Sequence, residues 1–156
     1  MIIAIDGPAG SGKSTISKKI SNELGLHYLD TGAMYRALTL EMMRRNIDFD
    51  DHEAIVSAAH ETDIEFKGTG TVQQQVYCNS KDVTSEIRVP EVTKNVKHVA
   101  KIPAVRERMV ALQRKIAQGK DVVLEGRDTT TVVFPHADFR IYIDAAQRER
   151  ARRRFV

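Results

Sequence analysis

The sequence contains a single cysteine, Cys78, and no apolar run close to the roughly 18 residues that a membrane-spanning helix requires. A lone cysteine excludes an internal disulfide framework and is consistent with a reducing compartment, so we expect a cytoplasmic protein without a membrane partner. No basic segment precedes the short apolar run at the N-terminus, so no signal peptide is predicted. The five histidines lack metal-ligand spacing, so a histidine-held metal centre is not expected.

The excess of positive over negative charge is small as well. The 156 residues carry a formal net charge of only +3, and 42% of them are hydrophobic, which is enough for one domain with a single core. Much of the positive excess lies near the end of the chain, in Arg148, Arg150, Arg152, Arg153 and Arg154. Such a segment is typical of a solvated helix face, a phosphate clamp or a nucleic-acid contact, and the mild net charge argues against the last.

Short apolar runs alternate with helical patterns along most of the chain. Strands are predicted at 2–6, 26–29, 122–124 and 139–143. Helices are predicted at 13–24 and 33–45, after a cap at Asp50 or Asp51, from Pro103 to Ile116, and close to the end of the chain. Strands separated by helices predict an α/β fold of three layers, with a mostly parallel sheet flanked by helices. In such sheets ligands bind at the carboxyl ends of the strands.

Each predicted helix has an apolar face that we expect to pack on the core. These faces are Ile16, Ile20 and Leu24; Met34, Leu38 and Met42; Ile55, Val56 and Ala59; and Val105, Met109, Leu112 and Ile116. Residues 62–88 differ, because DIEFKG and VQQQVYC have the pattern of strands with Gly68 and Gly70 between them. We therefore predict a small β-rich insertion, with Cys78 as a small buried side chain.

The segment from Gly7 to Ser14, GPAGSGKS, fits G-x-x-x-x-G-K-[ST] at every fixed position and follows a predicted strand. Its glycines let the backbone wrap closely around a phosphate chain, so that N–H groups point at the anion. Lys13 is suited to neutralise the β- and γ-phosphates, and the Ser14 hydroxyl is suited to bind Mg²⁺. The loop predicts binding of a nucleoside triphosphate.

Two arginines follow other strands at the same predicted edge of the sheet. Arg36 lies in DTGAMYR, after the second strand, and Arg127 lies in GRD, after the third. Either could be a solvated or ion-paired side chain, but two arginines beside a triphosphate loop favour a second bound phosphate. A guanine-reading N-K-x-D and a dinucleotide-binding G-x-G-x-x-G are both absent from this context, which argues against a GTPase and a dinucleotide enzyme.

Five segments, namely GPAGSGKST, LDTGAMYR, EIRVPEV, PAVRERM and GRD-x-x-TVVFP, are similar in order and spacing to those of the bacterial cytidylate kinases, a family of nucleoside monophosphate kinases. The resemblance covers nearly all of the chain. It implies a P-loop kinase core at 1–61 and 101–156 and an inserted α+β monophosphate-binding domain at 62–100. It also implies transfer of the γ-phosphate of ATP to CMP or dCMP with Mg²⁺.

The resemblance also implies roles for individual residues. ATP would be bound by the phosphate loop, comprising Gly7, Pro8, Ala9, Gly10, Ser11, Gly12, Lys13, Ser14 and Thr15, with Ser14 on the metal. Lys13, Arg36 and Arg127 would be the catalytic residues. Arg36 and Arg127 would bind the phosphate of CMP with help from Thr31 and Tyr35.

Arg106 and Asp128 would read the cytosine base on the same resemblance. A carboxylate accepts a hydrogen bond from the N4 amino group of cytosine, a donor that uracil lacks. Arg106 is otherwise a solvated helix arginine. Glu125 would orient a water molecule on the metal, or else cap the end of its strand. Attack by the CMP phosphate, already an anion, requires no general base.

Three features depart from the family pattern. Lys97 aligns where the family usually has a small hydroxyl residue, and Thr130 stands where it commonly has a glycine. If the backbone there needed a positive φ, threonine would be strained. The chain ends at Val156, where the family continues into a lid, so we expect Arg150, Arg152, Arg153 and Arg154 to begin that lid and this chain to turn over slowly or not at all.

The expected partners are therefore CMP or dCMP and ATP, with no nucleic acid, and the protein is expected to be a monomer. Two alternatives remain open at this stage. The first is a P-loop kinase for another small acceptor, which a comparison of CMP with UMP and AMP would separate. The second is a nucleotide-binding module without turnover, which ATP affinity measured beside activity would reveal.

Overall fold

The computed structural model describes residues 1–68 and 74–154, which form two compact units. Of the described residues, the first unit comprises 1–31 and 117–154, and the second comprises 32–68 and 74–116. Among these residues, no helix combines the length and the apolar character needed to cross a membrane. The boundaries predicted for an inserted domain, 62–100, stay a prediction.

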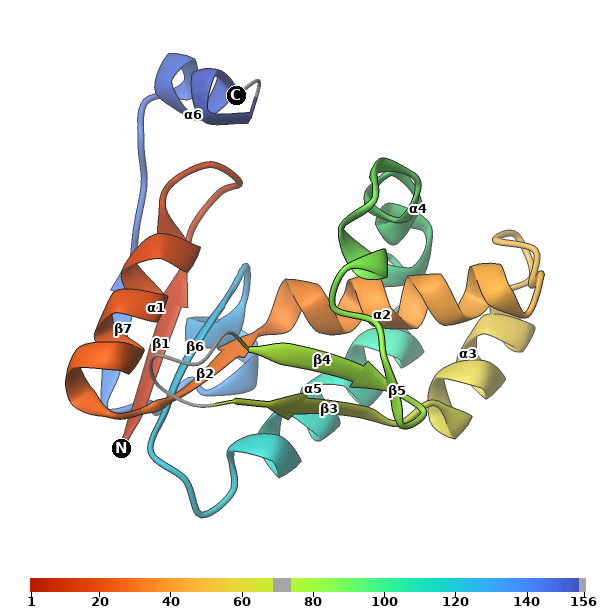
Figure 1. Ribbon diagram of the computed structural model, residues 1–156, viewed down its shortest axis with the longest axis horizontal. Coiled ribbons are helices and arrows are strands. Elements are labelled where there is room, and N and C mark those ends of the chain that lie inside the picture. The colour runs from red at the N-terminus through yellow and green to blue at the C-terminus, as the bar shows by residue number, and fades with distance from the viewer. Residues whose placement is uncertain (69–73, 155–156) are drawn as a thin grey trace. The chain divides into compact units, whose positions relative to one another are not determined.

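The first unit is built on a parallel sheet of four strands (Figure 1). Its strands are β1 (Ile2–Asp6), β2 (His27–Asp30), β6 (Val122–Gly126) and β7 (Phe139–Tyr142), in the order β2-β6-β1-β7. The helices of this unit are α1 (Lys13–Leu24) and α6 (Gln147–Arg154), with the π-helical turn η2 (Thr129–Val133) after β6. The α/β class and the parallel sheet predicted from the sequence are thus confirmed.

Strand register brings the polar segments to one edge of this sheet. Asp6 pairs with Gly126, and Asp30 pairs with Glu125, so the strand ends that lead into the phosphate loop, into Thr31 and into Arg127 are aligned. The central strands β1 and β6 are apolar over nearly their whole length, as expected for strands covered on both faces. The phosphate loop, the segment after Asp30 and the segment from Arg127 therefore start at the carboxyl edge, as the alternation of elements predicted.

The face that α1 buries differs from the prediction. Ile16 and Leu24 are 42% and 58% exposed, and the buried positions are Lys13, Ser17 and Ser21. Small hydroxyl residues at every fourth position let the helix approach β6 closely, and the Ser21 hydroxyl donates to the carbonyl of Leu26 at 2.6 Å. The prediction was wrong for the first and last of its three apolar residues. Of these three residues, Ile20 alone packs against the core cluster, which consists of Ile3, Ile5, Leu26 and Val123.

Two boundaries in this unit follow from a local hydrogen bond. Gly25 ends α1 with a φ of 67°, as predicted. The next strand begins at His27, one residue later than predicted, because the N–H of Leu26 bonds to the carbonyl of Ser21 and so completes the helix end.

The second unit contains four helices and a small antiparallel sheet. The helices are α2 (Thr31–Arg44), which begins at the last residue of the first unit, α3 (His52–Glu61), α4 (Pro90–Ala100) and α5 (Pro103–Ala117). The strands are β3 (Ile64–Lys67), β4 (Gln75–Cys78) and β5 (Lys81–Asp82), followed by the 3₁₀ turn η1 (Glu86–Arg88). The predicted apolar faces of α2 and α5 are confirmed, since Met34, Leu38, Met42, Val105 and Met109 are fully buried.

Helix α4 lies beyond residues 62–88, which were predicted to be β-rich, and within residues 62–100, which were predicted to form an inserted α+β domain. The small sheet fits the predicted insertion, and Gly70 and the first two residues of the predicted strand 72–78 lie outside the described residues. Residues 90–100 are helical, because Pro90 occupies the first helical turn and Val92 and Val99 face the core. That spacing was a helix signal in the sequence, obscured by the strand preference of valine.

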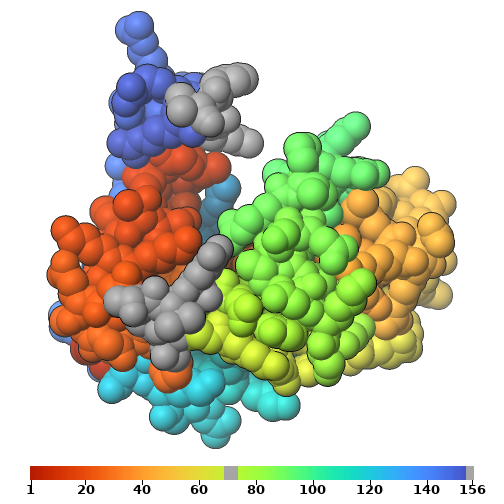
Figure 2. Space-filling view, viewed as in Figure 1, coloured from red at the N-terminus to blue at the C-terminus, as the bar shows by residue number. Residues whose placement is uncertain are grey.

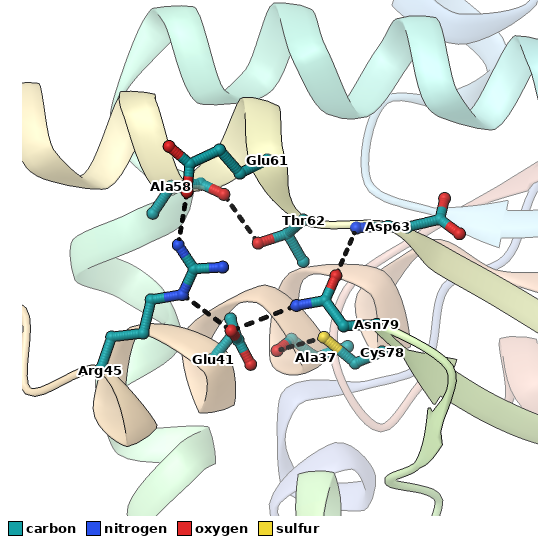
Figure 3. Close-up of polar contacts among 9 residues, drawn as sticks. All are labelled: Ala37, Glu41, Arg45, Ala58, Glu61, Thr62, Asp63, Cys78 and Asn79. Carbon is teal, nitrogen blue, oxygen red and sulfur yellow. Dashed lines mark hydrogen bonds and ion pairs between the residues drawn. The ribbon is translucent and has the colours of Figure 1, made fainter.

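A polar network joins α2, α3 and the β3–β4 pair (Figure 3). The Arg45 guanidinium donates to Glu41 at 2.8 Å and to Glu61 at 2.7 Å. The Asn79 side chain donates to Glu41 at 3.2 Å and accepts from the N–H of Asp63 at 2.9 Å. Because Asn79 adopts a φ of 48°, its side chain is held where these two bonds are possible.

The two candidate caps of α3 can be distinguished by substitution. The Asp51 carboxylate accepts from the N–H of Ala54 at 3.0 Å, whereas Asp50 uses its own N–H to bond Asp48. We expect Asp51→Ala to lower the unfolding free energy by about 1 kcal/mol, the usual cost of a lost N-cap. Asp50→Ala is the matched control, and urea unfolding measures both. Equal losses in the two variants would contradict the assignment of the cap.

Candidate nucleotide site

The phosphate loop has backbone conformations that favour glycine. Gly7, Gly10 and Gly12 have φ values of 153°, 78° and 99°. Lys13 is 9% exposed and its ammonium donates to the carbonyl of Pro8 at 2.9 Å, so the lysine folds back over its own loop. Burial, followed by the charge of Arg127, lowers the pKa of Lys13. Lys13 and Arg127 therefore lie close enough for their charges to interact, and their roles toward ATP and CMP stay predictions.

Two observations fit this loop to a phosphate chain. Helix α1 begins after Gly12 with no side chain capping it, which leaves the N–H groups of its first turn available to an anion. The Ser11 hydroxyl is buried and has no hydrogen-bond partner among the described residues. A buried hydroxyl without a hydrogen-bond partner destabilises the fold unless a ligand accepts a hydrogen bond from it. The residues of the loop thus fit a nucleoside triphosphate.

A buried carboxylate lies beside the first turn of α1. Glu125, at the end of β6, is 4% exposed and accepts a hydrogen bond from the Tyr28 hydroxyl. Burial raises the pKa of the Glu125 carboxyl, and hydrogen bonds from Tyr28 and Ser14 act against that rise. Burial also raises the pKa of the Tyr28 hydroxyl, so this pair stays hydrogen-bonded over the ordinary pH range.

The oxygen atoms near Ser14 suit Mg²⁺, which keeps water ligands, better than they suit a metal ion bound by protein ligands alone. The described residues contain no group of three or more histidine, cysteine, aspartate or glutamate side chains that could hold an ion. Mg²⁺ usually keeps several water ligands and takes the rest from one or two protein oxygens and substrate phosphates. The Ser14 hydroxyl and the Glu125 carboxylate supply oxygens of this kind.

The turn after GRD is attached to the end of β1. The Asp6 carboxylate is 2% exposed and accepts hydrogen bonds from the N–H and hydroxyl groups of both Thr129 and Thr130. Thr130 has no positive φ, so the threonine found at the family's glycine position is unstrained. The close approach occurs at Gly126 instead, where a Cβ atom would lie 2.5 Å from the Thr31 hydroxyl oxygen.

The predicted acceptor residues are divided between the two units. Thr31, Arg127 and Asp128 belong to the first, where Thr31 donates its hydroxyl to the carbonyl of Glu125 at 2.7 Å and Arg127 is exposed. Tyr35 and Arg36, in the second turn of α2, and Arg106, in the first turn of α5, belong to the second. Arg106 is exposed and Arg36 half-buried, and Lys97 is exposed on α4.

Sequence reasoning did not single out Asp6, Tyr28 or Thr129. The position of Asp6, directly before the phosphate loop, was a sequence signal that this carboxylate belongs to the site. The other two signals were weaker, because a tyrosine in a strand and a threonine in a turn are common. Their roles become visible only through hydrogen bonds that span about a hundred residues of sequence, 97 for Tyr28 and 123 for Thr129.

Helix α6 lies against the phosphate loop (Figure 2). The Arg153 guanidinium donates to the carbonyl of Gly10 at 3.2 Å, and a Cβ atom on Gly10 would lie 2.9 Å from the carbonyl oxygen of Arg150. Two of the arginines predicted to begin a lid are therefore beside the loop. Arg152 instead pairs with Glu149 at 2.9 Å and is exposed.

The buried Glu125 carboxyl predicts a pH dependence of stability. Its pKa in the folded chain is raised above 4.5, so the folded state binds this proton more tightly than the unfolded state does. Stability is therefore lost as pH rises from 4.5 through the raised pKa. We expect Glu125→Gln, which does not titrate, to gain stability relative to the parent as pH rises above 4.5, measured by urea unfolding without nucleotide. Glu23→Gln, at an exposed site on α1, is the control, and the same pH dependence in both variants would contradict the prediction.

Comparison with known proteins identifies the family of this chain. The cytidylate kinase family model matches residues 3–156. The cytidylate kinase of Caldanaerobacter subterraneus subsp. tengcongensis is 51% identical over 153 residues, which cover 98% of this chain and 66% of that protein. The cytidylate kinase of Pelotomaculum thermopropionicum is 50% identical over 152 residues, covering 97% of this chain and 67% of that protein. The chain thus spans about two thirds of the length of these relatives, and it belongs to the cytidylate kinase family.

Proposed function

We propose that this protein transfers the γ-phosphate of ATP to CMP or dCMP, giving ADP and CDP or dCDP. The observation that carries the proposal is the electrostatic proximity of Lys13 and Arg127 at the edge of the sheet where the phosphate loop begins. Further negative charge between these two cations would lower their repulsion, which the carboxylates of Glu125, Asp6 and Asp30 already offset in part. A triphosphate and an acceptor phosphate supply that negative charge.

The ATP side of the proposal rests on the phosphate loop. The loop amides and the orphaned Ser11 hydroxyl would bind the β- and γ-phosphates, and Lys13 would turn from the Pro8 carbonyl toward them. When bound, Mg²⁺ would neutralise charge on the phosphate oxygens. The Ser14 hydroxyl would hold the ion, and Glu125 would orient its hydration shell.

The acceptor side is assigned to residues that follow the other strands. Arg36 and Arg127 would bind the phosphate of CMP with Thr31 and Tyr35, and Arg106 and Asp128 would recognise cytosine. Phosphoryl transfer depends mainly on positioning and on neutralising oxygens in a loose transition state. The attacking phosphate oxygen is already negative, so these side chains orient it and no base is required.

Arg150 and Arg153 would close over ATP, which their contacts with the phosphate loop support. The product would enter pyrimidine nucleotide metabolism. The single buried thiol of Cys78 agrees with a reducing cytoplasm, and we propose that the protein works there as a monomer.

A nucleotide panel tests the proposal. ADP release would be measured with ATP, Mg²⁺ and each of CMP, dCMP, UMP and AMP, with calorimetric titration of each nucleotide alongside. CMP- or dCMP-dependent release is the expected result. A preference for UMP or AMP would overturn the assignment of Arg106 and Asp128. Binding of ATP with no ADP release in the presence of any of the four acceptors would indicate a nucleotide-binding module.

A further inference from the structure

The Asp6 carboxylate is completely occupied by one short stretch of chain. Its Oδ1 atom accepts from the Thr129 N–H at 2.8 Å and the Thr129 hydroxyl at 2.6 Å. Its Oδ2 atom accepts from the Thr130 N–H at 2.8 Å and the Thr130 hydroxyl at 2.5 Å. At 2% exposure, almost no water competes for these four bonds, which we call the Asp6 clamp.

The clamp lies between two parts of the candidate site. Asp6 is the last residue of β1 and directly precedes Gly7 of the phosphate loop, and Thr129 directly follows Asp128. Gly126 is paired with Asp6 in the sheet register. Arg127 and Asp128 therefore form a two-residue arch whose ends, Gly126 and Thr129, are both attached to the same residue of β1.

The turn that follows the arch does not depend on the hydroxyl groups. The N–H groups of Val132 and Val133 bond to the carbonyl of Asp128 at 2.8 and 3.2 Å, and the N–H of Phe134 bonds to that of Thr129 at 2.9 Å. The clamp also keeps its two backbone bonds if a hydroxyl is replaced by a methyl group. Removing the hydroxyls should thus loosen the arch while the turn and the sheet remain.

We propose that Asp6 is a positioning residue that holds the Arg127–Asp128 arch in its acceptor-binding conformation through the hydroxyl groups of Thr129 and Thr130. The inference rests on the proposed function, because it assigns the arch to CMP. A ligand-binding side chain that is fixed in advance loses less conformational freedom on binding, and this raises affinity. The phosphate loop has its own glycine-defined conformation, so ATP affinity does not depend on the two hydroxyls.

Valine and serine substitutions separate the hydroxyl groups from the methyl groups. Valine keeps the branched shape of threonine, and this matters because a Cβ atom on Gly126 would lie only 2.7 Å from the Thr129 methyl group. We expect Thr129→Val with Thr130→Val to weaken CMP binding about tenfold in calorimetric titration, as for loss of hydrogen bonds to a charged group. ATP affinity should remain within about twofold, and the corresponding double serine variant should retain CMP affinity, since it keeps both hydroxyls.

Thr131→Val is the matched control, because the Thr131 hydroxyl is exposed and bonds to the carbonyl of Asp128 at 3.4 Å without contacting Asp6. Unchanged CMP affinity in the double valine variant would overturn the proposal. Equal losses for CMP and ATP would overturn it too, because they indicate a structural role alone. If the double variant does not fold, the Thr130→Val single variant is read in the same way.

A second measurement separates this inference from the proposed function. Should the parent chain bind ATP but not CMP, the acceptor assignment fails, and amide hydrogen exchange at Arg127 and Asp128 still tests the clamp. Exchange about tenfold faster in the valine variants than in the parent and in Thr131→Val would support the clamp. Identical exchange rates would overturn it whatever the ligand.

Discussion

Lys13→Met is expected to lower turnover of ATP and CMP by at least about a hundredfold, in line with the loss of one charged group that stabilises a transition state. The Lys13 ammonium lies within the phosphate loop, where it donates a 2.9 Å hydrogen bond to the Pro8 carbonyl. Methionine has a similar length and flexibility but no charge. ADP release measures the loss, and calorimetric titration measures the accompanying loss of ATP affinity.

The same variant should not be less stable. Burial lowers the pKa of Lys13, which means that the folded chain holds the charged ammonium less readily than the unfolded chain does. The unfolding free energy therefore rises with pH as this group loses its proton, and a neutral side chain removes the cost at neutral pH. The unfolding midpoint of Lys13→Met is expected to equal or exceed that of the parent.

Lys19→Met is the matched control, because Lys19 lies on the same helix with a side chain 75% exposed. It should change neither ATP affinity nor turnover. If Lys13→Met binds ATP as the parent does, the assignment of the phosphate loop is wrong. A parallel fall in stability and binding would show instead that the lysine is structural.

Gly7→Ala is expected to have the largest effect on folding, a loss of about 3 kcal/mol or more in unfolding free energy, from overpacking combined with a conformation unfavourable to alanine. A Cβ atom at Gly7 would lie 2.0 Å from the backbone carbonyl oxygen of Ile143, and its φ of 153° is rare for alanine. The backbone of Ile143 is itself fixed, because its N–H bonds to the carbonyl of Asp6 at 2.8 Å. In the Gly7→Ala variant, the end of β1 and the segment after β7 therefore cannot both keep their positions.

Gly119→Ala provides the comparison. Gly119 has a φ of 71°, and a Cβ atom there would meet nothing within 4 Å, so its cost is conformational alone, about 1 kcal/mol. Urea unfolding measures both variants, and ATP titration should find binding retained only in Gly119→Ala. Similar losses in the two variants would mean that the chain relaxes around the new atom and that the close approach is not a constraint.

The sequence alone was sufficient for features set by neighbouring residues. The phosphate loop, the strands before it and after it, the helix end at Gly25 and the apolar faces of α2 and α5 all depend on residues within a few positions of one another. Such features follow from backbone preferences and from the spacing of apolar side chains. The parallel sheet followed as well, because alternating strands and helices have few compatible arrangements.

Only the tertiary structure decided which face of α1 is buried. The apolar spacing of Ile16 and Leu24 predicted one face, but the helix must present Lys13 to the phosphate loop, and that turns Ser17 and Ser21 toward the sheet. A position required by the site thus overrides the local pattern. Likewise, valines suited to strands form helix α4, because their spacing places Val92 and Val99 against the core.

The partners of the site carboxylates were also decided by the sheet order. Tyr28 meets Glu125 because β2 lies beside β6, and Asp6 meets Thr129 because β6 lies beside β1. These pairs are separated by 97 and 123 residues, so no local pattern relates them. The phosphate loop is encoded locally, by glycines and a lysine that directly follow a strand. The side chains that surround this loop depend on which strands hydrogen-bond side by side, because that pairing brings residues distant in the sequence into contact.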